Sequence, residues 1–214
     1  KKLLLKIRQS ILQEAIEGKL TAEWRKHNPM SKGDPDLDAE ALLVIIRSEK
    51  EKRISEGKIK KEKPLSPIVP DEMEFVLPEG WRWIRLGTAG WIVRGKSPVY
   101  SEDGESIILN QKCVRWFVIE TAWGKTVSKT WLESIEKSLY TQAGDILVNS
   151  TGEGTIGRAA IVDINAANLL FDSHVLKYST LLNARYIASC INSVFCQTQI
   201  DKIKGANTTK QTEL

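Results

Sequence analysis

The first 24 residues carry apolar side chains at helical spacing between charged ones. One stripe consists of Leu4, Ile7, Ile11 and Ala15, and a neighbouring stripe consists of Leu5, Leu12, Ile16 and Leu20. This pattern predicts one amphipathic helix over residues 1–24. Its apolar face is broad, so we expect another surface to cover it. The turn signals Asn28-Pro29 and Gly33-Asp34-Pro35 follow it.

A second helix is expected after these turns. Asp36 or Asp38 can cap it, because a short carboxylate accepts the free backbone N–H groups of a first helical turn. Its apolar positions recur at helical spacing and Gly57 marks its end; they are Leu42, Ile45, Ile46 and Ile54. The charged stretch up to Lys63 is typical of a solvated helix end. Four of the seven prolines then fall in residues 64–78, which predicts an extended linker and a domain boundary.

Beyond the linker, short β-branched and aromatic runs alternate with turn residues. These runs predict strands at Trp81–Leu86, Trp91–Val93, Ser106–Leu109, Asp145–Asn149, Ala159–Ile164 and His174–Tyr178. One helix should close the domain, capped by Asn183 and ending before Gly205. The sequence therefore predicts an α+β protein, with a helical arm at 1–63, a linker at 64–78 and a β-rich domain with short helices at 79–214.

Composition narrows the class of protein only slightly. A chain of 214 residues with 42% apolar residues suits one or two packed domains. Its apolar runs are too short for a membrane span, and charged residues near the N-terminus exclude a signal peptide. Three cysteines without metal-ligand spacing are typical of reduced thiols in a cytoplasm. The net charge of +4 is compatible with nucleic-acid binding without indicating it.

The segment Asn149–Arg158 contains a G-x-G-x-x-G string at Gly152, Gly154 and Gly157. In a dinucleotide-binding fold this string opens a helix, and an acid such as Asp172 follows about 20 residues on. Here the residues after the string predict a strand, which favours a glycine-rich hairpin loop. A nucleotide-dependent enzyme stays an alternative that requires cofactor binding and a helix after Gly157.

The tripeptide Asp172-Ser173-His174 contains the residue types of a catalytic triad. Triads are assembled from separate segments, and on a strand Asp172 and His174 would face one way and Ser173 the other. We therefore expect His174 to make one hydrogen bond at the domain surface, with a DNA contact as the alternative.

Several motifs, in order, resemble the target-recognition domain of specificity subunits from type I restriction–modification enzymes. They are Leu77–Trp81 through Leu86-Gly87, Arg94–Pro98, Ile108–Trp116, Asp145–Arg158 and Phe171–Val175. Residues 1–24, with Ile7–Leu12 and Glu17–Leu20, resemble the helical spacer between the two recognition domains of such a subunit. The resemblance covers almost the whole chain.

The resemblance implies a non-catalytic subunit that recognises one half of a split DNA sequence. Its implied partners are double-stranded DNA, methyltransferase subunits that bring S-adenosylmethionine, and restriction subunits that bring ATP and magnesium. No cofactor, metal or membrane partner is expected for the chain itself. The family carries two recognition domains and a coiled coil of two spacer helices, so we expect a fragment, or a half-length subunit that can form a homodimer through its N-terminal helix.

The expected DNA contacts are polar and cationic residues that follow predicted strands or lie in glycine-rich loops. Amides can read adenine, Lys and Arg can read guanine, and hydroxyls and glycine N–H groups can bind phosphate. The candidates are Lys96, Ser97, Tyr100, Asn110, Gln111, Lys112, Arg115, Ser150, Thr151, Gly152, Gly154, Thr155, Arg158 and His174.

Other readings of these residues stay open. Each candidate is also a common surface residue, and Glu153 at the loop tip can accept from a cytosine or do nothing. The tryptophans are expected in the core rather than as stacking platforms. The polar segment Gly205–Gln211 is a further candidate contact, or Thr209 or Thr212 caps a following helix. A protein-interaction module that binds no nucleic acid is a third class, which salt-sensitive binding to duplex DNA would distinguish.

Overall fold

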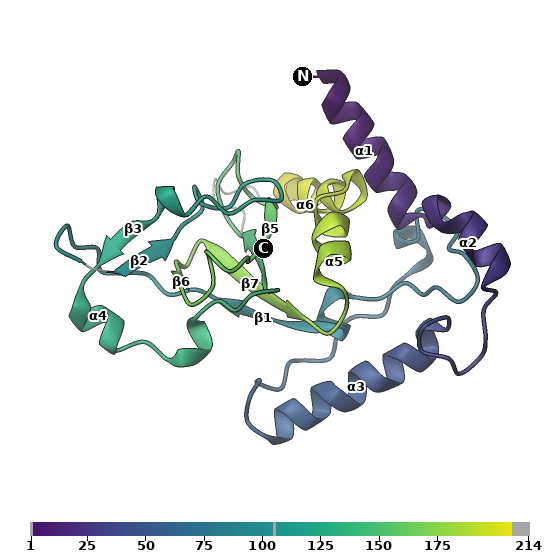
Figure 1. The fold of residues 1–214 in the computed structure, drawn as a ribbon, viewed down its shortest axis with the longest axis horizontal. Helices are drawn as coiled ribbons and strands as arrows, with labels where there is room; N and C mark the ends of the chain where they lie inside the picture. Colours follow the sequence, from purple (N-terminus) through teal and green to yellow (C-terminus); the bar gives the residue numbers. More distant parts are fainter. Residues whose placement is uncertain (1, 105, 207–214) are drawn as a thin grey trace. The chain divides into compact units, whose positions relative to one another are not determined.

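The computed structural model describes residues 2–104 and 106–206. It has two compact units, Lys1–Trp91 and Ile92–Leu214. The division follows residue 91, whereas the composition placed a boundary within residues 64–78. Helices and sheets together confirm the predicted α+β class (Figure 1).

In the first unit, the N-terminal apolar pattern forms two helices and not one. Helix α1 (Lys2–Ile16) ends before Gly18, and a short turn, η1 (Lys19–Thr21), leads into α2 (Ala22–His27). Gly18 has a φ of 74°, and a Cβ there would lie 2.7 Å from the Pro78 side chain. The predicted continuous helix over 1–24 is therefore wrong, because a left-handed glycine ends α1.

Helix α3 (Ala39–Ser55) confirms the second predicted helix and its cap. Asp38 accepts hydrogen bonds from the backbone N–H of Gly33 (3.0 Å) and of Glu40 (2.9 Å). These donors hold the pKa of Asp38 below its ordinary value, that of Gly33 contributing most. Leu43 and Ile46 form its buried face, and the helix stops just before Gly57 as predicted.

The rest of the first unit contains short helical turns, η2 (Pro70–Glu72) and η3 (Leu86–Thr88). The predicted strand Trp81–Leu86 is wrong, because the backbone of this segment pairs with no strand among the described residues. Its side chains instead contact residues of the preceding segment. The Arg85 guanidinium bonds both oxygens of Glu72 at 2.7 Å, and the Trp83 ring lies 4.6 Å from that of Phe75.

The second unit is built on two sheets. The four-stranded sheet has the order β1-β7-β4-β5 and comprises β1 (Gly90–Arg94, which crosses the division), β4 (Ile146–Asn149), β5 (Ala159–Ile161) and β7 (Val175–Thr180). The three-stranded sheet has the order β3-β2-β6 and comprises β2 (Ser106–Leu109), β3 (Lys125–Val127) and β6 (Leu170–Phe171). Strand β4 is antiparallel to β5 and β7, while β2 is antiparallel to β3 and parallel to β6.

Strand β4 is buried on both faces and joins two hydrophobic cores. Because side chains alternate along a strand, Leu147 packs in a core shared with β2 and β6, while Ile146 and Val148 pack against Ile187 and Ile191. The last two belong to helix α5 (Ala184–Ile191). The four-stranded sheet is therefore covered by the other sheet on one face and by α5 on the other (Figure 1).

Most of the strand predictions for the second unit are confirmed. Five predicted runs coincide with β1, β2, β4, β5 and β7, although β5 is shorter than expected and β7 begins after His174. The sequence missed β3, β6, helix α4 (Lys129–Glu133) and the turns η4 (Thr121–Trp123) and η5 (Lys137–Leu139). These elements have two to five residues, which is too short for a periodic signal.

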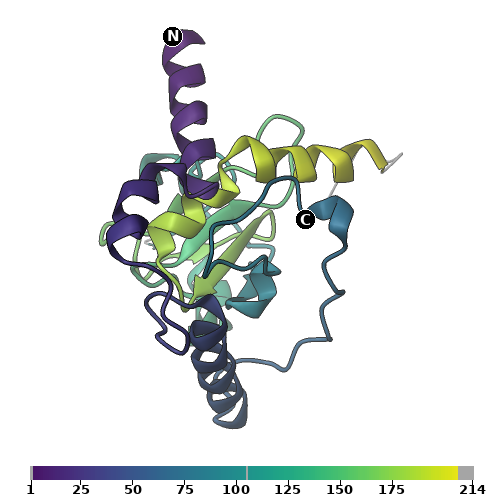
Figure 2. The same ribbon diagram turned by 90° about the vertical axis from the view of Figure 1, so that its right-hand side faces the viewer.

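The predicted closing helix is two helices. Asn183 caps α5 as expected, accepting from the backbone N–H of Tyr186 at 3.1 Å. The buried Asn192 amide then bonds both backbone groups of Ala159, and Ser193 Oγ accepts from Cys196 N at the start of α6 (Val194–Ala206). The chain turns at this point (Figures 1 and 2). Within residues 2–104 and 106–206, no helix combines the length and apolarity that crossing a membrane requires.

Candidate nucleic-acid interface

The glycine-rich segment forms the loop of a β-hairpin. Strand β4 pairs antiparallel with β5, with Val148 opposite Ala159, so the chain leaves Gly157 into a strand as predicted. The loop is closed internally, because the backbone N–H groups of Thr155 and Ile156 both donate to Gly152 O (3.0 and 2.9 Å). A strand in this position aims no helix N-terminus at a phosphate, which removes the dinucleotide-binding interpretation.

Loops from four parts of the second unit are joined by hydrogen bonds. Thr155 Oγ1 donates to Gln111 Oε1 (3.2 Å), and Asn149 Nδ2 donates to the backbone oxygen of Gln111 (3.0 Å). Thr151 Oγ1 and His174 Nδ1 lie 2.8 Å apart, and Ser97 Oγ donates to Ser173 Oγ at 3.2 Å. Residues 95–100, 110–116, 149–158 and 172–174, hereafter the four-loop surface, therefore lie together. All fourteen predicted contacts belong to it.

Two of the loops pack closely against each other at Gly95. A Cβ on Gly95 would lie 2.1 Å from Asp172 O and 2.3 Å from Phe171 O. Both neighbours are backbone atoms, so they cannot move aside as a flexible side chain would. Gly95 is thus required for one loop to pack against another.

We expect Gly95→Ala to lower the free energy of unfolding of the second unit by about 1–3 kcal/mol, the usual cost of overpacking. Gly154→Ala is the matched control, because a Cβ there would meet nothing within 4 Å; its effect should stay within about 0.5 kcal/mol. Urea unfolding of the two variants measures both changes. Equal stability of the two variants would contradict this account of loop packing.

Several predicted contacts are exposed, and the structure adds a neighbour to one of them. Lys96, Lys112 and His174 are exposed, as are Gly152 and Gly154. Tyr100 is 46% exposed, with Lys125 Nζ 4.8 Å from its ring centroid. Both residues line a hollow of about 440 Å³. Sequence reasoning missed Lys125 because the three-residue strand β3 was not predicted.

Other predicted contacts serve the loops themselves. Asn110 is 6% exposed; its Nδ2 donates to Trp123 O and its Oδ1 accepts from Lys112 N, both at 2.8 Å. Arg158 Nη2 donates to Gly154 O at 2.6 Å. The Ser150 hydroxyl is fully buried and has no hydrogen-bond partner among the described residues. These three side chains are therefore better placed to support the loops than to contact a ligand.

The expectation that the tryptophans lie in the core is wrong for three of them, of which Trp24, in the first unit, is 54% exposed. Trp116 and Trp123 are 41% and 52% exposed. Trp123 Nε1 donates to Glu120 Oε2 at 2.8 Å, and the Arg115 guanidinium carbon lies 5.7 Å from the Trp123 ring centroid. Glu120 and Trp123 therefore accompany the predicted contact Arg115. No signal in the sequence alone joins these three residues.

Residues 172–174 form a turn before β7 and not a catalytic arrangement. Asp172 is 3% exposed and accepts from the backbone N–H of His174 at 2.9 Å. Burial raises the pKa of Asp172, and the His174 N–H opposes that shift. The exposed His174 ring bonds Thr151, which confirms the expected single hydrogen bond at the surface.

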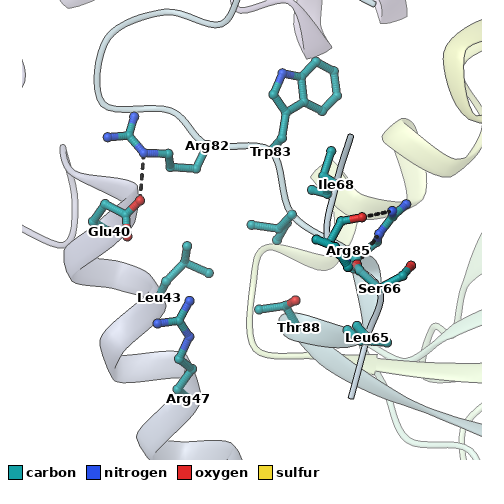
Figure 3. Close-up of a pocket in the computed structure, with 12 residues that line it drawn as sticks. Glu40, Leu43, Arg47, Leu65, Ser66, Ile68, Arg82, Trp83, Arg85 and Thr88 are labelled. Atoms are coloured by element: carbon teal, nitrogen blue, oxygen red, sulfur yellow. Dashed lines mark hydrogen bonds and ion pairs between the residues drawn. The ribbon is translucent and has the colours of Figure 1, made fainter. Parts of the chain in front are cut away.

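A separate pocket of about 270 Å³ lies within the first unit (Figure 3). Helix α3 provides one wall with Glu40, Leu43 and Arg47, and residues 65–68 and 82–88 provide the other. An ion pair at 2.8 Å joins Arg82 Nε to Glu40 Oε1 across it. None of the predicted DNA contacts lines this pocket.

Two remaining predictions concern metals and the C-terminal loop. Within the described part of the chain, no group of His, Cys, Asp or Glu is arranged to hold a metal ion. Gly205 and Ala206 belong to α6, so the prediction that the closing helix ends before Gly205 and gives way to a polar loop is wrong at these two residues. The rest of that loop, with the caps Thr209 and Thr212, lies outside the described residues. Cys113, Cys190 and Cys196 are free thiols.

Fold and surface together define a β-rich domain that presents a polar and cationic set of loops. The chain is 31% identical over 202 residues to the EcoEI type I restriction enzyme specificity subunit of Escherichia coli, covering 87% of this chain and 31% of the relative. It is 41% identical over 108 residues to the EcoAI specificity subunit of the same organism, covering 49% of this chain and 17% of the relative. No family model matches the chain.

Solved structures of the same kind are also similar. The HsdS subunit from Thermoanaerobacter tengcongensis matches 82% of this chain and 43% of its own with a TM-score of 0.45 at 15% identity. A chain from a type I restriction–modification complex matches 77% of this chain and 40% of its own with a TM-score of 0.44 at 16% identity.

The sequence matches confirm the resemblance that the motifs indicated. Over most of its length, the chain is homologous to part of a type I restriction enzyme specificity subunit. It spans about a third or less of the length of these relatives.

Proposed function

We propose that this chain recognises one half of a split DNA target as part of a type I specificity subunit. The observation that carries the proposal is the convergence of the predicted contacts, from four separate loops, on one hydrogen-bonded surface. A β-rich scaffold that holds adaptable polar loops suits base recognition, because loop side chains can vary while the sheets stay fixed.

The exposed side chains supply two kinds of contact. Lys96 and Lys112 are cations that can neutralise phosphates, and the hydroxyls and the His174 ring can donate to phosphate oxygens. Gln111 can approach a base edge once its Oε1 exchanges the Thr155 hydroxyl for an adenine amino group. The chain itself takes no catalytic role in this proposal and needs no cofactor of its own.

The proposed partners follow from the names of the relatives, which are subunits of restriction enzymes. Methyltransferase subunits would carry out the chemistry at the site that this domain selects, and restriction subunits would join them. We further propose that a homodimer through α1 would place two recognition domains at a fixed separation, which fits a split, palindromic target.

The decisive experiment is co-expression with cognate methyltransferase subunits, followed by mapping of the methylated sites. A single split sequence motif is the expected result. Absence of sequence preference, or duplex binding that does not weaken with salt, would contradict the proposed function.

Within that complex, we expect Lys112→Ala to weaken binding about equally for all DNA sequences and to reduce the salt slope by about one unit, as for loss of one phosphate contact. Arg185→Ala is the matched control, because Arg185 is also exposed but lies outside the four-loop surface. His174 immediately precedes β7, whereas Arg185 lies in α5, which follows the other end of that strand. The control variant should leave affinity unchanged. Fluorescence anisotropy on labelled duplexes over a salt series measures both. An equal effect of the two variants would argue against the four-loop surface.

A further inference from the structure

Arg115 is held from two sides while one edge of its guanidinium group stays free. Its Nε donates to Glu120 Oε2 at 3.3 Å, and the guanidinium lies over the Trp123 ring. Within residues 2–104 and 106–206, neither Nη atom has a hydrogen-bond partner. The side chain is 37% exposed, so this Nη edge can reach a ligand.

The residues that hold Arg115 are themselves fixed. The Trp123 indole donates to the same Glu120 oxygen that Arg115 bonds, at 2.8 Å, and Trp123 N donates to Glu120 O at 3.2 Å. From below, the buried Asn110 amide donates to Trp123 O at 2.8 Å. Glu120 and Trp123 therefore form one bonded group with Arg115, supported by a buried side chain.

The backbone beneath this group is a tight hairpin. Arg115 N donates to Val118 O and Glu120 N donates to Cys113 O, both at 2.9 Å. Cys113 and Val114 are fully buried. The carboxylate and the guanidinium are thus set opposite each other across a rigid turn, which lowers the conformational entropy that Arg115 loses on binding.

This arrangement favours a base edge over a phosphate. The free Nη edge presents two parallel donors, which match the O6 and N7 acceptors of guanine. The Glu120 carboxylate beside Arg115 lowers the net charge of the pair, which reduces its Coulomb attraction to a phosphate more than its hydrogen bonds to a neutral base edge. The Trp123 ring sets the plane in which those bonds point. Lys112 differs from Arg115: it is exposed, it pairs with no acid among the described residues, and it therefore acts as a mobile point charge.

We infer that Arg115 determines specificity by reading a guanine in the major groove, and that Glu120 and Trp123 are its positioning residues. The inference rests on the proposed function and adds a base identity and three residue roles to it. The chain would accordingly require a G·C pair at one position of its half-target.

The test uses the specificity subunit assembled with its methyltransferase subunits on a duplex library randomised around the wild-type target. Arg115→Ala should reduce discrimination for guanine at one position by roughly 10- to 100-fold, the value of one bidentate contact. Other positions should keep their preference. Lys112→Ala is the matched control and should lower methylation at all sequences without changing any preference.

The positioning roles predict a further result. Glu120→Gln and Trp123→Phe should each weaken discrimination at the same position as Arg115→Ala, and neither should add to that loss in the Arg115→Ala background. A merely structural role would lower methylation equally at all positions and would persist in that background. Thermal unfolding of each variant confirms that the domain is folded.

The outcomes separate this inference from the proposed function. If the wild-type complex selects a sequence and Arg115→Ala keeps the same preference at every position, the guanine contact is wrong and the function stands. A uniform loss with Arg115→Ala would make it a phosphate contact and would equally overturn the inference. If the wild-type complex selects no sequence, the proposed function itself fails.

Discussion

Replacing Lys177 with Met is expected to lower the free energy of unfolding of the second unit by about 3 kcal/mol. Lys177 lies in β7 with its side chain 7% exposed, and its Nζ donates to Ser138 O (2.9 Å) and Tyr140 O (2.8 Å). It also lies 3.7 Å from Asp145 Oδ2. Removing the ammonium leaves these acceptors unsatisfied, and breaking a buried ion pair typically costs about 3–5 kcal/mol.

The desolvation of Lys177 does not reverse this expectation. Burial lowers the pKa of Lys177, and the Asp145 carboxylate opposes the shift. The ammonium therefore costs free energy to bury, and the three acceptors around it offset that cost. Methionine has a similar length but donates no hydrogen bond. The variant therefore loses the favourable contacts of the ammonium, while the acceptors stay buried without a donor.

Urea unfolding, with hydrogen exchange of the β4 and β7 amides, measures this change in the second unit. Lys129→Met is the matched control, because Lys129 is exposed on α4 and should tolerate the change within about 0.5 kcal/mol. A second substitution, Asp145→Asn, should recover part of the loss in the Lys177→Met background, since it removes the unpaired carboxylate. A Lys177→Met protein as stable as the control would contradict the structural role of this residue.

Periodicity predicted the elements that have long, uninterrupted patterns. The apolar run before Asn149 gave β4, and the cap and spacing around Asp38 gave α3, because both signals are local. The breaks at Gly18 and at Asn192 could not be predicted in the same way. Gly18 is a local stop signal that the apolar stripe continuing to Leu20 concealed, whereas the break at Asn192 depends on its bonds to Ala159, which lies far away in the sequence.

The same reason limits what the sequence shows of the site. Residue types in loops indicated which segments could contact DNA, and the structure joins those segments. The sequence did not show which of these residues support the loops and which can contact a ligand, because Asn110 and Arg115 are both ordinary polar residues after a strand. Only the structure shows that Asn110 is buried and bonds the backbone of Trp123, while the Arg115 side chain is 37% exposed. Burial, and not residue type, separates a side chain that shapes a surface from one that meets a ligand.

Helix α1 presents an uncovered apolar stripe that supports self-association. Leu4, Ile7 and Ile11, three members of the first predicted stripe, are 71%, 47% and 51% exposed. Ile16, from the second stripe, is 5% exposed and thus covered. Exposed apolar side chains at helical spacing favour pairing with a second apolar helix, and two copies of this helix would supply matching stripes.

Ile11→Glu is therefore expected to weaken self-association of the chain by more than about 100-fold. A two-fold dimer contains two copies of Ile11, and burying each such side chain contributes about 1.5–3 kcal/mol. Ser10→Glu is the matched control, because Ser10 is the exposed neighbour of Ile11. This substitution adds the same charge, but on the polar side of α1. Light scattering over a micromolar concentration series should show a dimer for the wild-type and control chains and a monomer for Ile11→Glu. Near-ultraviolet circular dichroism should be unchanged, since the variant leaves the second unit intact. A wild-type chain that stays monomeric at high micromolar concentration would remove the basis for the homodimer, and α1 would then need a different apolar partner helix.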